Sequence, residues 1–392
     1  MAKKIERNYG IDLLRMISMF MVVVLHVINW GGLQAQISPL TLKGELIWFI
    51  DIACWCAVNC YALISGYVGI NAKHKYSSII QLWLQVLFYS LIGIGIHIGI
   101  TLSHGGDISI KFLVSNAFPF LFEKYWYFTA YVLLFFFMPL LNYIVNNAPR
   151  RLLKSMVIPA IIFFGCVGLL RGNYNSINSG FSVLWLAIMY MSGGYISKYN
   201  VFSNWSVKKS LIGYFVCILL AFASRIILAL ITSKVLGNYY RINFFIEYQS
   251  PLMVAAAIFL FNAFRKVNIK DKGKAFIRIV APTSFGVYLI HENPIIRSLV
   301  ITDKFIPYLS KPVYFMIGLI ILTVLIIYIS CVLVDFLRIQ LFKLLKIKQL
   351  SNWIEKQFGR IFLWLLKTLK IDFSERETAE KAANEELEEE EK

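Results

Sequence analysis

Acidic side chains are scarce in this sequence until its C-terminal end. Residues 372–392 hold ten of the 22 aspartates and glutamates, although the chain is 392 residues long. Only 16% of all residues are charged and 58% are hydrophobic, which is too apolar for a soluble protein of this length. The composition therefore excludes a soluble enzyme and, because no soluble domain remains, a nucleic-acid-binding protein. The net charge of +17 instead favours attraction to anionic membrane lipids.

Metal-ligand spacings are also missing. The six cysteines all fall within apolar segments, and their spacing matches neither a zinc site nor a haem attachment site, so we interpret them as small core residues. We expect no metal ion and no resident cofactor. The first apolar segment contains charged residues and lacks a small-residue cleavage site, so we expect it to stay in the protein rather than be removed as a signal peptide.

Long apolar stretches dominate the rest of the sequence. Ten of them are long enough to cross a bilayer as a helix, at about 11–30, 46–70, 78–102, 125–146, 152–170, 181–196, 211–235, 244–264, 276–296 and 312–336. The predicted fold class is therefore an all-α polytopic membrane protein, a bundle of about ten transmembrane helices. The sixth stretch is short and the ninth contains Pro282, which leaves a range of eight to eleven spans open.

Lysine and arginine set the predicted orientation. The N-terminus and alternate loops contain 16 of them, against nine in the opposite set of loops. Both termini should therefore be cytoplasmic, in a multi-pass protein of the plasma membrane. Residues 337–371 mix large apolar side chains with Lys and Arg, a pattern typical of an amphipathic interfacial helix on the inner leaflet. The composition of residues 372–392 predicts an acidic, disordered cytoplasmic tail.

One arginine and one histidine stand inside the first apolar segment. Arg15 and His26 are eleven residues apart, which on an α-helix is three turns plus about 20° and a rise of about 16 Å, so they share a face at two depths. Asp12 can pair with the Arg15 guanidinium from three residues away. Ionisable groups inside a membrane are costly and indicate a functional site.

Each of these residues has a functional and a structural interpretation. Arg15, paired with Asp12, can bind phosphate oxygens, or it can simply reach to lipid headgroups. His26 can take a proton from a hydroxyl, or it can be a buried histidine bonded to a neighbouring group. The shared face favours the functional interpretation for His26.

Other ionisable residues give weaker signals. His291 lies in the predicted outer half of the ninth segment, where it could meet His26 or instead occupy the membrane interface. Asp51 and Glu247 could each orient an imidazole. Arg225 is in mid-span, so it needs a carboxylate or a polar cavity.

Aromatic residues gather at the external end of the fourth segment, where Glu123–Phe128 includes Trp126 and Tyr127. Aromatic side chains at this depth usually form the interfacial belt, but they also make platforms on which sugar rings stack. Both interpretations stay open. On the second one, Trp126, Tyr127 and Glu247 bind substrate.

These motifs together resemble the acyltransferase 3 family. The resemblance covers about residues 8–336, and it depends mainly on the motif of an arginine, ten residues and a histidine, present here as Arg15 and His26. Supporting similarities are the stretches Ile64-Ser65-Gly66-Tyr67, Tyr125-Trp126-Tyr127-Phe128, Met138-Pro139-Leu140-Leu141 and Ser284 through His291.

The resemblance implies a function. Members of this family are integral membrane O-acyltransferases that move an acyl group from acyl-CoA, usually acetyl-CoA, to a hydroxyl of a cell-surface or lipid-linked glycan. Residues 1–336 would then be a membrane acyltransferase domain in which Arg15 contacts the donor and His26, with His291, acts in transfer.

Two alternatives accompany this implied function. Some members carry an esterase-like domain outside the membrane; no such segment is seen in this sequence, so it would act alone or with separate glycan-assembly proteins. The rival hypothesis is a transporter or flippase of a glycan or lipid-linked intermediate, which needs no CoA.

Overall fold

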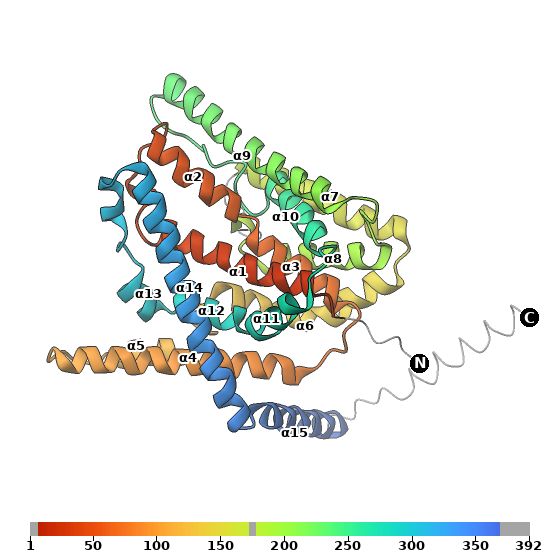
Figure 1. Cartoon of the computed structure of the whole chain (residues 1–392). Helices are drawn as coiled ribbons and strands as arrows, with labels where there is room; N and C mark the ends of the chain where they lie inside the picture. Colours follow the sequence, from red (N-terminus) through yellow and green to blue (C-terminus); the bar gives the residue numbers. More distant parts are fainter. Residues whose placement is uncertain (1–6, 172–177, 369–392) are drawn as a thin grey trace, which may run out of the picture. The chain divides into compact units, whose positions relative to one another are not determined.

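Helices make up every regular element that the structure describes. This is a computed structural model, and it describes residues 7–171 and 178–368. The chain divides into two compact units, which we describe separately. The larger unit, Met1–His74 with Leu84–Gln340, is a helical bundle, and the smaller one contains Lys75–Trp83 and the chain from Leu341 onward (Figure 1). The all-α class is thus confirmed, and the predicted tail 372–392 lies outside the described residues.

The first helix is the hub of the bundle. It packs against α2, α3, α10, α11 and α12. The helices are α1 (Tyr9–Asn29), α2 (Leu42–Cys54), α3 (Ala57–Gly69), α4 (Tyr76–Ser103), α5 (Ile110–Ala117), α6 (Trp126–Asn147), α7 (Arg150–Arg171), α8 (Val183–Tyr199), α9 (Val207–Leu236), α10 (Pro251–Phe264), α11 (Asp271–Val280), α12 (Ser284–His291), α13 (Pro294–Val300) and α14 (Val313–Leu344). Short 3₁₀ turns are η1 (Gln34–Gln36), η2 (Asn178–Gly180), η3 (Ala281–Thr283) and η4 (Ile306–Ser310).

Several helices are long and apolar enough to cross a membrane. Among the described residues there are six such segments, Tyr9–Gln36, Leu42–Gly69, α4, α6, α9 and α14. The chain is therefore a multi-pass membrane protein, but the predicted count of about ten spans is not confirmed. The predicted sixth and eighth spans are helices of only 17 and 14 residues, α8 and α10. The ninth is broken into α11, η3, α12 and α13, because Pro282 and Pro294 lack the N–H that a helix interior needs.

The cysteine prediction holds for most of the set. Cys54, Cys56, Cys60, Cys217 and Cys331 are buried and unpaired. Cys166 differs, since it lies exposed on α7. The predicted core role was therefore wrong for Cys166. An apolar sequence does not distinguish a helix face toward the bundle from a helix face toward lipid.

Helices α3 and α8 touch backbone to backbone through glycines. A Cβ atom on Gly66 of α3 would lie 1.8 Å from the Tyr190 carbonyl oxygen, and one on Gly193 of α8 would lie 2.1 Å from the Leu63 oxygen. Small residues at such crossings let membrane helices pack closely without a hydrophobic driving force. This crossing fixes α3, which carries residues of the candidate site.

Gly66→Ala should therefore destabilise the bundle by at least about 1–3 kcal/mol, because the two backbones must separate. The matched control is Gly95→Ala on α4, where an added Cβ meets nothing within 4 Å and the higher helix propensity of alanine should leave stability unchanged or slightly higher. Thermal unfolding in detergent, followed by size-exclusion chromatography, measures both. Equal melting temperatures for the two variants would contradict the close crossing.

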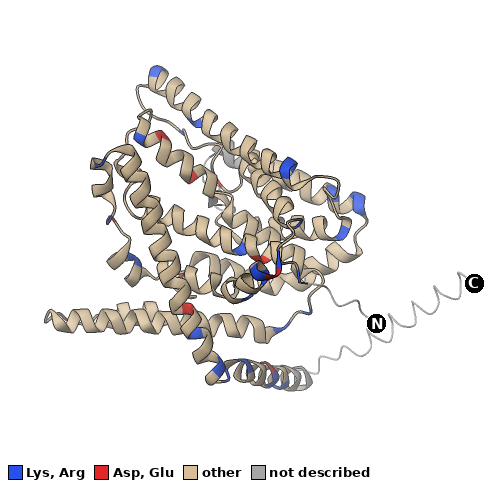
Figure 2. Ribbon diagram, in the orientation of Figure 1, with Lys and Arg blue, Asp and Glu red and all other residues tan. Residues whose placement is uncertain are grey.

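Charged residues inside the bundle have partners. In Figure 2 long stretches of the helices carry no charged residue, and Lys and Arg lie mainly at helix ends and in loops. Arg225 of α9 is fully buried. An arginine buried in mid-span requires a partner for its charge. Its Nη1 donates to both carboxylate oxygens of Glu45 at 2.8 Å, and its guanidinium lies 4.2 Å from the centre of the Trp48 ring.

The smaller unit joins the start of α4 to α15 (Ile347–Thr368). Glu355 of α15 accepts a hydrogen bond of 2.8 Å from the Tyr76 N–H, and bonding to Ser77 lowers the pKa of this carboxyl. Within the predicted amphipathic segment 337–371, α14 continues to Leu344 and α15 begins at Ile347. One stripe of α15 exposes apolar side chains, at Leu350, Trp353, Ile361, Trp364 and Leu365. Its place on the inner leaflet stays a prediction.

Candidate functional site

Ion pairs hold the motif-bearing face of α1 near the N-terminal end of the helix. Asn8 caps the helix by accepting hydrogen bonds from Gly10 N–H and Ile11 N–H. Nη1 of Arg15 donates to Oδ1 of Asp12 at 2.7 Å, which confirms the predicted pairing, and Arg7 binds the other carboxylate oxygen. The Arg15 side chain remains 34% exposed. Its cationic group therefore stays available to an anionic ligand.

The second element of the site is the break between α12 and α13. Because Pro294 disfavours a helical residue before it, α12 ends at His291 and Asn293 begins α13 by accepting from Ile295 and Ile296 N–H. Nδ2 of Asn293 donates to the Tyr125 hydroxyl at 3.0 Å and to the backbone oxygen of Tyr89. The break is thereby fixed to α4 and to the start of α6.

The end of α1 is tied to the same region. The Asp303 N–H donates to the Trp30 oxygen at 2.9 Å, and the Phe305 N–H donates to the Gly31 oxygen at 3.1 Å. These bonds join the turn after α1 to the loop after α13. They bring His26, one turn before the end of α1, next to the end of α12.

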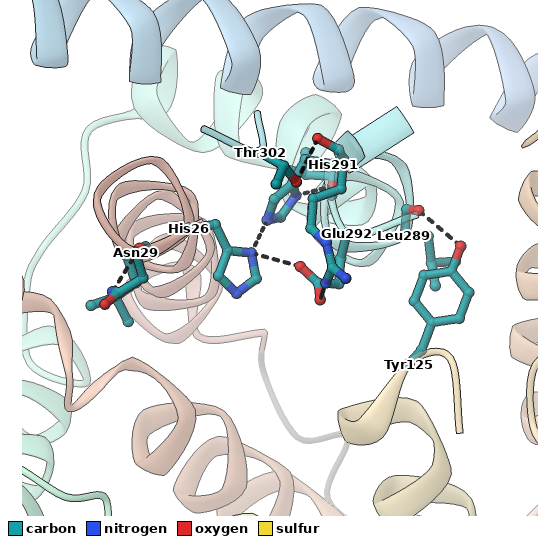
Figure 3. A network of polar contacts seen from close by, with 10 residues as sticks. His26, Asn29, Tyr125, Leu289, His291, Glu292 and Thr302 are labelled. Atoms are coloured by element: carbon teal, nitrogen blue, oxygen red, sulfur yellow. Dashed lines mark hydrogen bonds and ion pairs between the residues drawn. The ribbon is translucent and has the colours of Figure 1, made fainter. Parts of the chain in front are cut away.

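Two imidazoles and a carboxylate meet at this point (Figure 3). Nδ1 of His26 lies 2.9 Å from Nε2 of His291, and the ring centroids are 4.9 Å apart. The same Nδ1 lies 3.1 Å from Oε2 of Glu292. His291 is almost fully buried, at 1% exposed, whereas the His26 side chain is 18% exposed. Of the two rings, His26 is the one that a substrate can approach.

The hydrogen bonds determine which nitrogen of each neutral ring carries the proton. Nδ1 of His291 faces the Val287 carbonyl oxygen, which can only accept, so this nitrogen must donate. In a neutral His291, Nε2 is then an acceptor, and His26 donates to it from Nδ1. The lone pair of His26 is therefore on Nε2, which has no hydrogen-bond partner among the described residues. That nitrogen can take a proton.

Glu292 and Arg297 complete the cluster. Arg297 Nη1 donates to Oε1 of Glu292, while its guanidinium lies 4.2 Å from the centre of the Trp30 ring. Glu292 is 6% exposed, so its carboxylate is desolvated and paired. A negative charge 3.1 Å from His26 Nδ1 would stabilise the imidazolium that forms when Nε2 takes a proton.

Sequence reasoning missed Glu292 and Arg297 as functional residues. The only signal was position: Glu292 directly follows His291, and Arg297 comes five residues later. Asp51 and Glu247, the carboxylates considered instead, do not contact either imidazole in the described structure. Asp51 accepts hydrogen bonds from Asn29, Gln34 and Trp55.

Tyrosine rings lie between the arginine and the imidazoles. Tyr127 packs edge-on against Tyr61 at 6.1 Å and against Tyr288 at 6.3 Å, and it stacks on Tyr131 at 6.3 Å. The Tyr61 hydroxyl donates to the backbone oxygen of Arg15 at 2.7 Å. Tyr127 thus lies inside the bundle near the candidate site, and an outward-facing belt does not describe its contacts.

Trp126 belongs to a second aromatic group. Its ring lies 4.7 Å from Phe181 and 6.4 Å from Tyr248, and Tyr248 lies 4.8 Å from Trp55. Glu247 neighbours this group in the chain, where its Oε2 accepts from Gln249 Nε2 at 3.0 Å. Burial raises the pKa of the Glu247 carboxyl. The aromatic rings from four separate segments come together here.

The described residues contain no group of three or more His, Cys, Asp or Glu side chains that could hold a metal ion. The contacts of the two histidines and Glu292 give the imidazole cluster the geometry of an acid–base site. It consists of one accessible ring, a second ring that fixes its tautomer and a carboxylate that stabilises its charged form.

The family model of an acyltransferase domain, that of acyltransferase 3, matches residues 8–333. No curated protein and no solved structure matches the chain. The matched residues include both histidines, Glu292, Arg297 and every tyrosine of the cluster. The chain therefore belongs to the acyltransferase 3 family, and it is a membrane acyltransferase.

Proposed function

We propose that this protein moves an acyl group, with acetyl as the first candidate, from cytosolic acyl-CoA to a hydroxyl of a cell-surface or lipid-linked glycan. The observation that carries the proposal is the lone pair on His26 Nε2, which follows from the contacts of His26 with His291. An acyltransferase needs a base for the acceptor hydroxyl, and a positioned imidazole is the commonest one.

The transfer step uses this imidazole twice. The acceptor oxygen attacks the thioester carbonyl carbon while its proton moves to His26 Nε2. The carbon–sulfur bond then breaks, and the CoA sulfur leaves and takes the proton back from the imidazolium. During the step, Glu292 offsets the positive charge on the His26 ring. His291 holds that ring in place by accepting a hydrogen bond from His26 Nδ1–H. The products are an ester and free CoA.

Arg15 and Asp12 are proposed to bind the donor at the cytosolic end. The guanidinium is exposed enough to reach phosphate oxygens, for which its fork geometry is well suited. The rise of about 16 Å from Arg15 to His26 is comparable to the length of a pantetheine arm. A nucleotide held near Arg15 would thus present its thioester near His26.

The acceptor is proposed to bind at the aromatic group of Trp126, Phe181, Tyr248 and Trp55, with Tyr127 and Glu247 at its edges. Flat rings and a nearby carboxylate suit the apolar faces and hydroxyls of a sugar. On the orientation predicted from Lys and Arg, with both termini cytoplasmic in the plasma membrane, this group faces outward.

Purified protein in nanodiscs, given acetyl-CoA labelled in its acetyl group and a lipid-linked oligosaccharide, should release one thiol for each labelled ester formed. Free thiol is read with a colorimetric reagent and the ester by chromatography. Absence of both products with a range of glycan acceptors would overturn the proposed donor. Product without thiol release would point to a different acyl source. NMR of surface glycans from cells with and without the protein identifies the acceptor.

A further inference from the structure

Two buried hydroxyl groups beside the candidate site have no hydrogen bond of normal geometry within the described residues. They belong to Ser284 and Tyr288 on α12, which are 4% and 5% exposed. Tyr127 and Tyr131 on α6 are partly buried, and their hydroxyls continue the row that begins with this pair. Buried tyrosine hydroxyls usually find a partner, and a buried hydroxyl without one costs roughly the hydrogen bond that it forgoes. Such a group indicates a missing ligand.

These hydroxyls lie on one continuous path from Arg15 to the imidazoles. The Tyr61 hydroxyl donates to the backbone oxygen of Arg15, and the Tyr61 ring packs against Tyr127. Tyr131 stacks on Tyr127, and Tyr127 packs against Tyr288.

The path ends at the histidine pair. Tyr288 packs against His291 at 6.4 Å, and His291 contacts His26. On α12 the residues Ser284, Tyr288 and His291 follow at intervals of four and three, so they share one face.

Tyr61 lies at the Arg15 end of the path. Its hydroxyl donates to the Arg15 oxygen, and it lies beside Ser284 without a hydrogen bond of normal geometry between the two. Residues of α1, α3, α6 and α12 therefore form a strip of hydroxyls, of which Ser284 and Tyr288 are buried without a partner, with the Arg15 cation at one end and the proposed base at the other.

We propose that this strip binds the pantetheine arm of the acyl-CoA donor through its two amide groups. The inference rests on the proposed function, because it assumes that acyl-CoA is the donor. A hydroxyl both donates and accepts, so it can serve an amide N–H or an amide C=O. The tyrosine rings supply apolar walls for the methylene groups between the amides. Apart from Arg15 at its end, the strip consists of uncharged serine and tyrosine side chains. This suits an uncharged arm that follows a charged nucleotide.

The test removes single hydroxyls and measures donor binding. Tyr288→Phe, Ser284→Ala and Tyr127→Phe keep the shape of the strip. A thioether analogue of acetyl-CoA, which cannot transfer its acyl group, is titrated against each variant by calorimetry in nanodiscs. Each lost hydroxyl should weaken binding about three- to tenfold, the typical effect of one hydrogen bond. Adenosine 3′,5′-bisphosphate, which lacks the arm, should bind all variants as it binds the unsubstituted protein.

Tyr190→Phe is the matched control. Its hydroxyl already donates to Asn142 Oδ1 at 2.8 Å, so its loss should lower the melting temperature without changing donor affinity. Tyr288→Phe should show the opposite pattern, with weaker donor binding and an unchanged or higher melting temperature, since an unpaired buried group is removed. A purely structural role would not give this pattern.

The outcomes separate the two proposals. If the unsubstituted protein binds the analogue and the three variants bind it equally well, the strip does not hold the arm and the inference is overturned. If the three variants bind adenosine 3′,5′-bisphosphate more weakly, to the same degree as they bind the analogue, the hydroxyls contact the nucleotide. The inference is then overturned as well. If the unsubstituted protein binds no CoA compound, the proposed function itself fails.

Discussion

His26→Gln is expected to lower kcat by about 10²- to 10⁴-fold, the usual contribution of a general base. The amide keeps a donor and an acceptor near His291 and Glu292, so the cluster can stay assembled. It cannot take a proton at neutral pH, and the acceptor hydroxyl would attack without a base. The Kd for acyl-CoA should change little, because the nucleotide and the arm are held by Arg15 and the tyrosine strip, which come before His26 on the donor path. Turnover is measured as CoA release in the presence of acceptor.

The control for this substitution is His97→Gln. His97 belongs to α4, and its ring packs against Phe112, with centroids 4.0 Å apart, rather than against either imidazole of the site. This variant should turn over at the rate of the unsubstituted protein. If His26→Gln also retained full kcat, then Nε2 would not accept the proton, and the base would have to be sought elsewhere.

Glu292→Gln should lower kcat by about 10- to 100-fold with little effect on donor binding. Two unit charges about 4 Å apart interact by about 4 kcal/mol at an effective dielectric constant of 20, and Arg297 offsets part of this at Glu292. The uncharged amide would stabilise the His26 imidazolium less, so the barrier rises. The variant separates kcat from Kd, which a loss of folding would not do.

Glu355→Gln provides the comparison for a carboxylate elsewhere. Its amide oxygen can still accept the hydrogen bond from the Tyr76 N–H, so activity should be unchanged. A Glu292→Gln enzyme that kept its kcat would show that the carboxylate only holds Arg297 and has no part in the chemistry.

Helix periodicity made the first half of the site predictable. Asp12, Arg15 and His26 lie on a single uninterrupted helix, and there the angle and rise per residue are known in advance. The ion pair of Asp12 with Arg15 followed from the same geometry. The partner side of the site could not be predicted in this way, because Glu292 reaches His26 only through the break at Asn293 and Pro294.

Hydropathy located the apolar segments but not their interruptions. A window of about twenty residues averages over Pro282 and Pro294, so 276–296 looked like one span, whereas it contains the short helix that carries His291. The partners of buried charges could not be predicted for a related reason. Arg225 required a carboxylate, but nothing in the sequence indicates that Glu45, 180 residues away, lies beside it.

The bonds from Trp30 and Gly31 to Asp303 and Phe305 run between main-chain atoms only. Their strength does not depend on which side chains that loop carries. The spacing of the two imidazoles is consequently most sensitive to insertions or deletions in residues 301–306, which would shift the backbone register by whole residues. Length, more than composition, is the property of this loop that the chemistry demands.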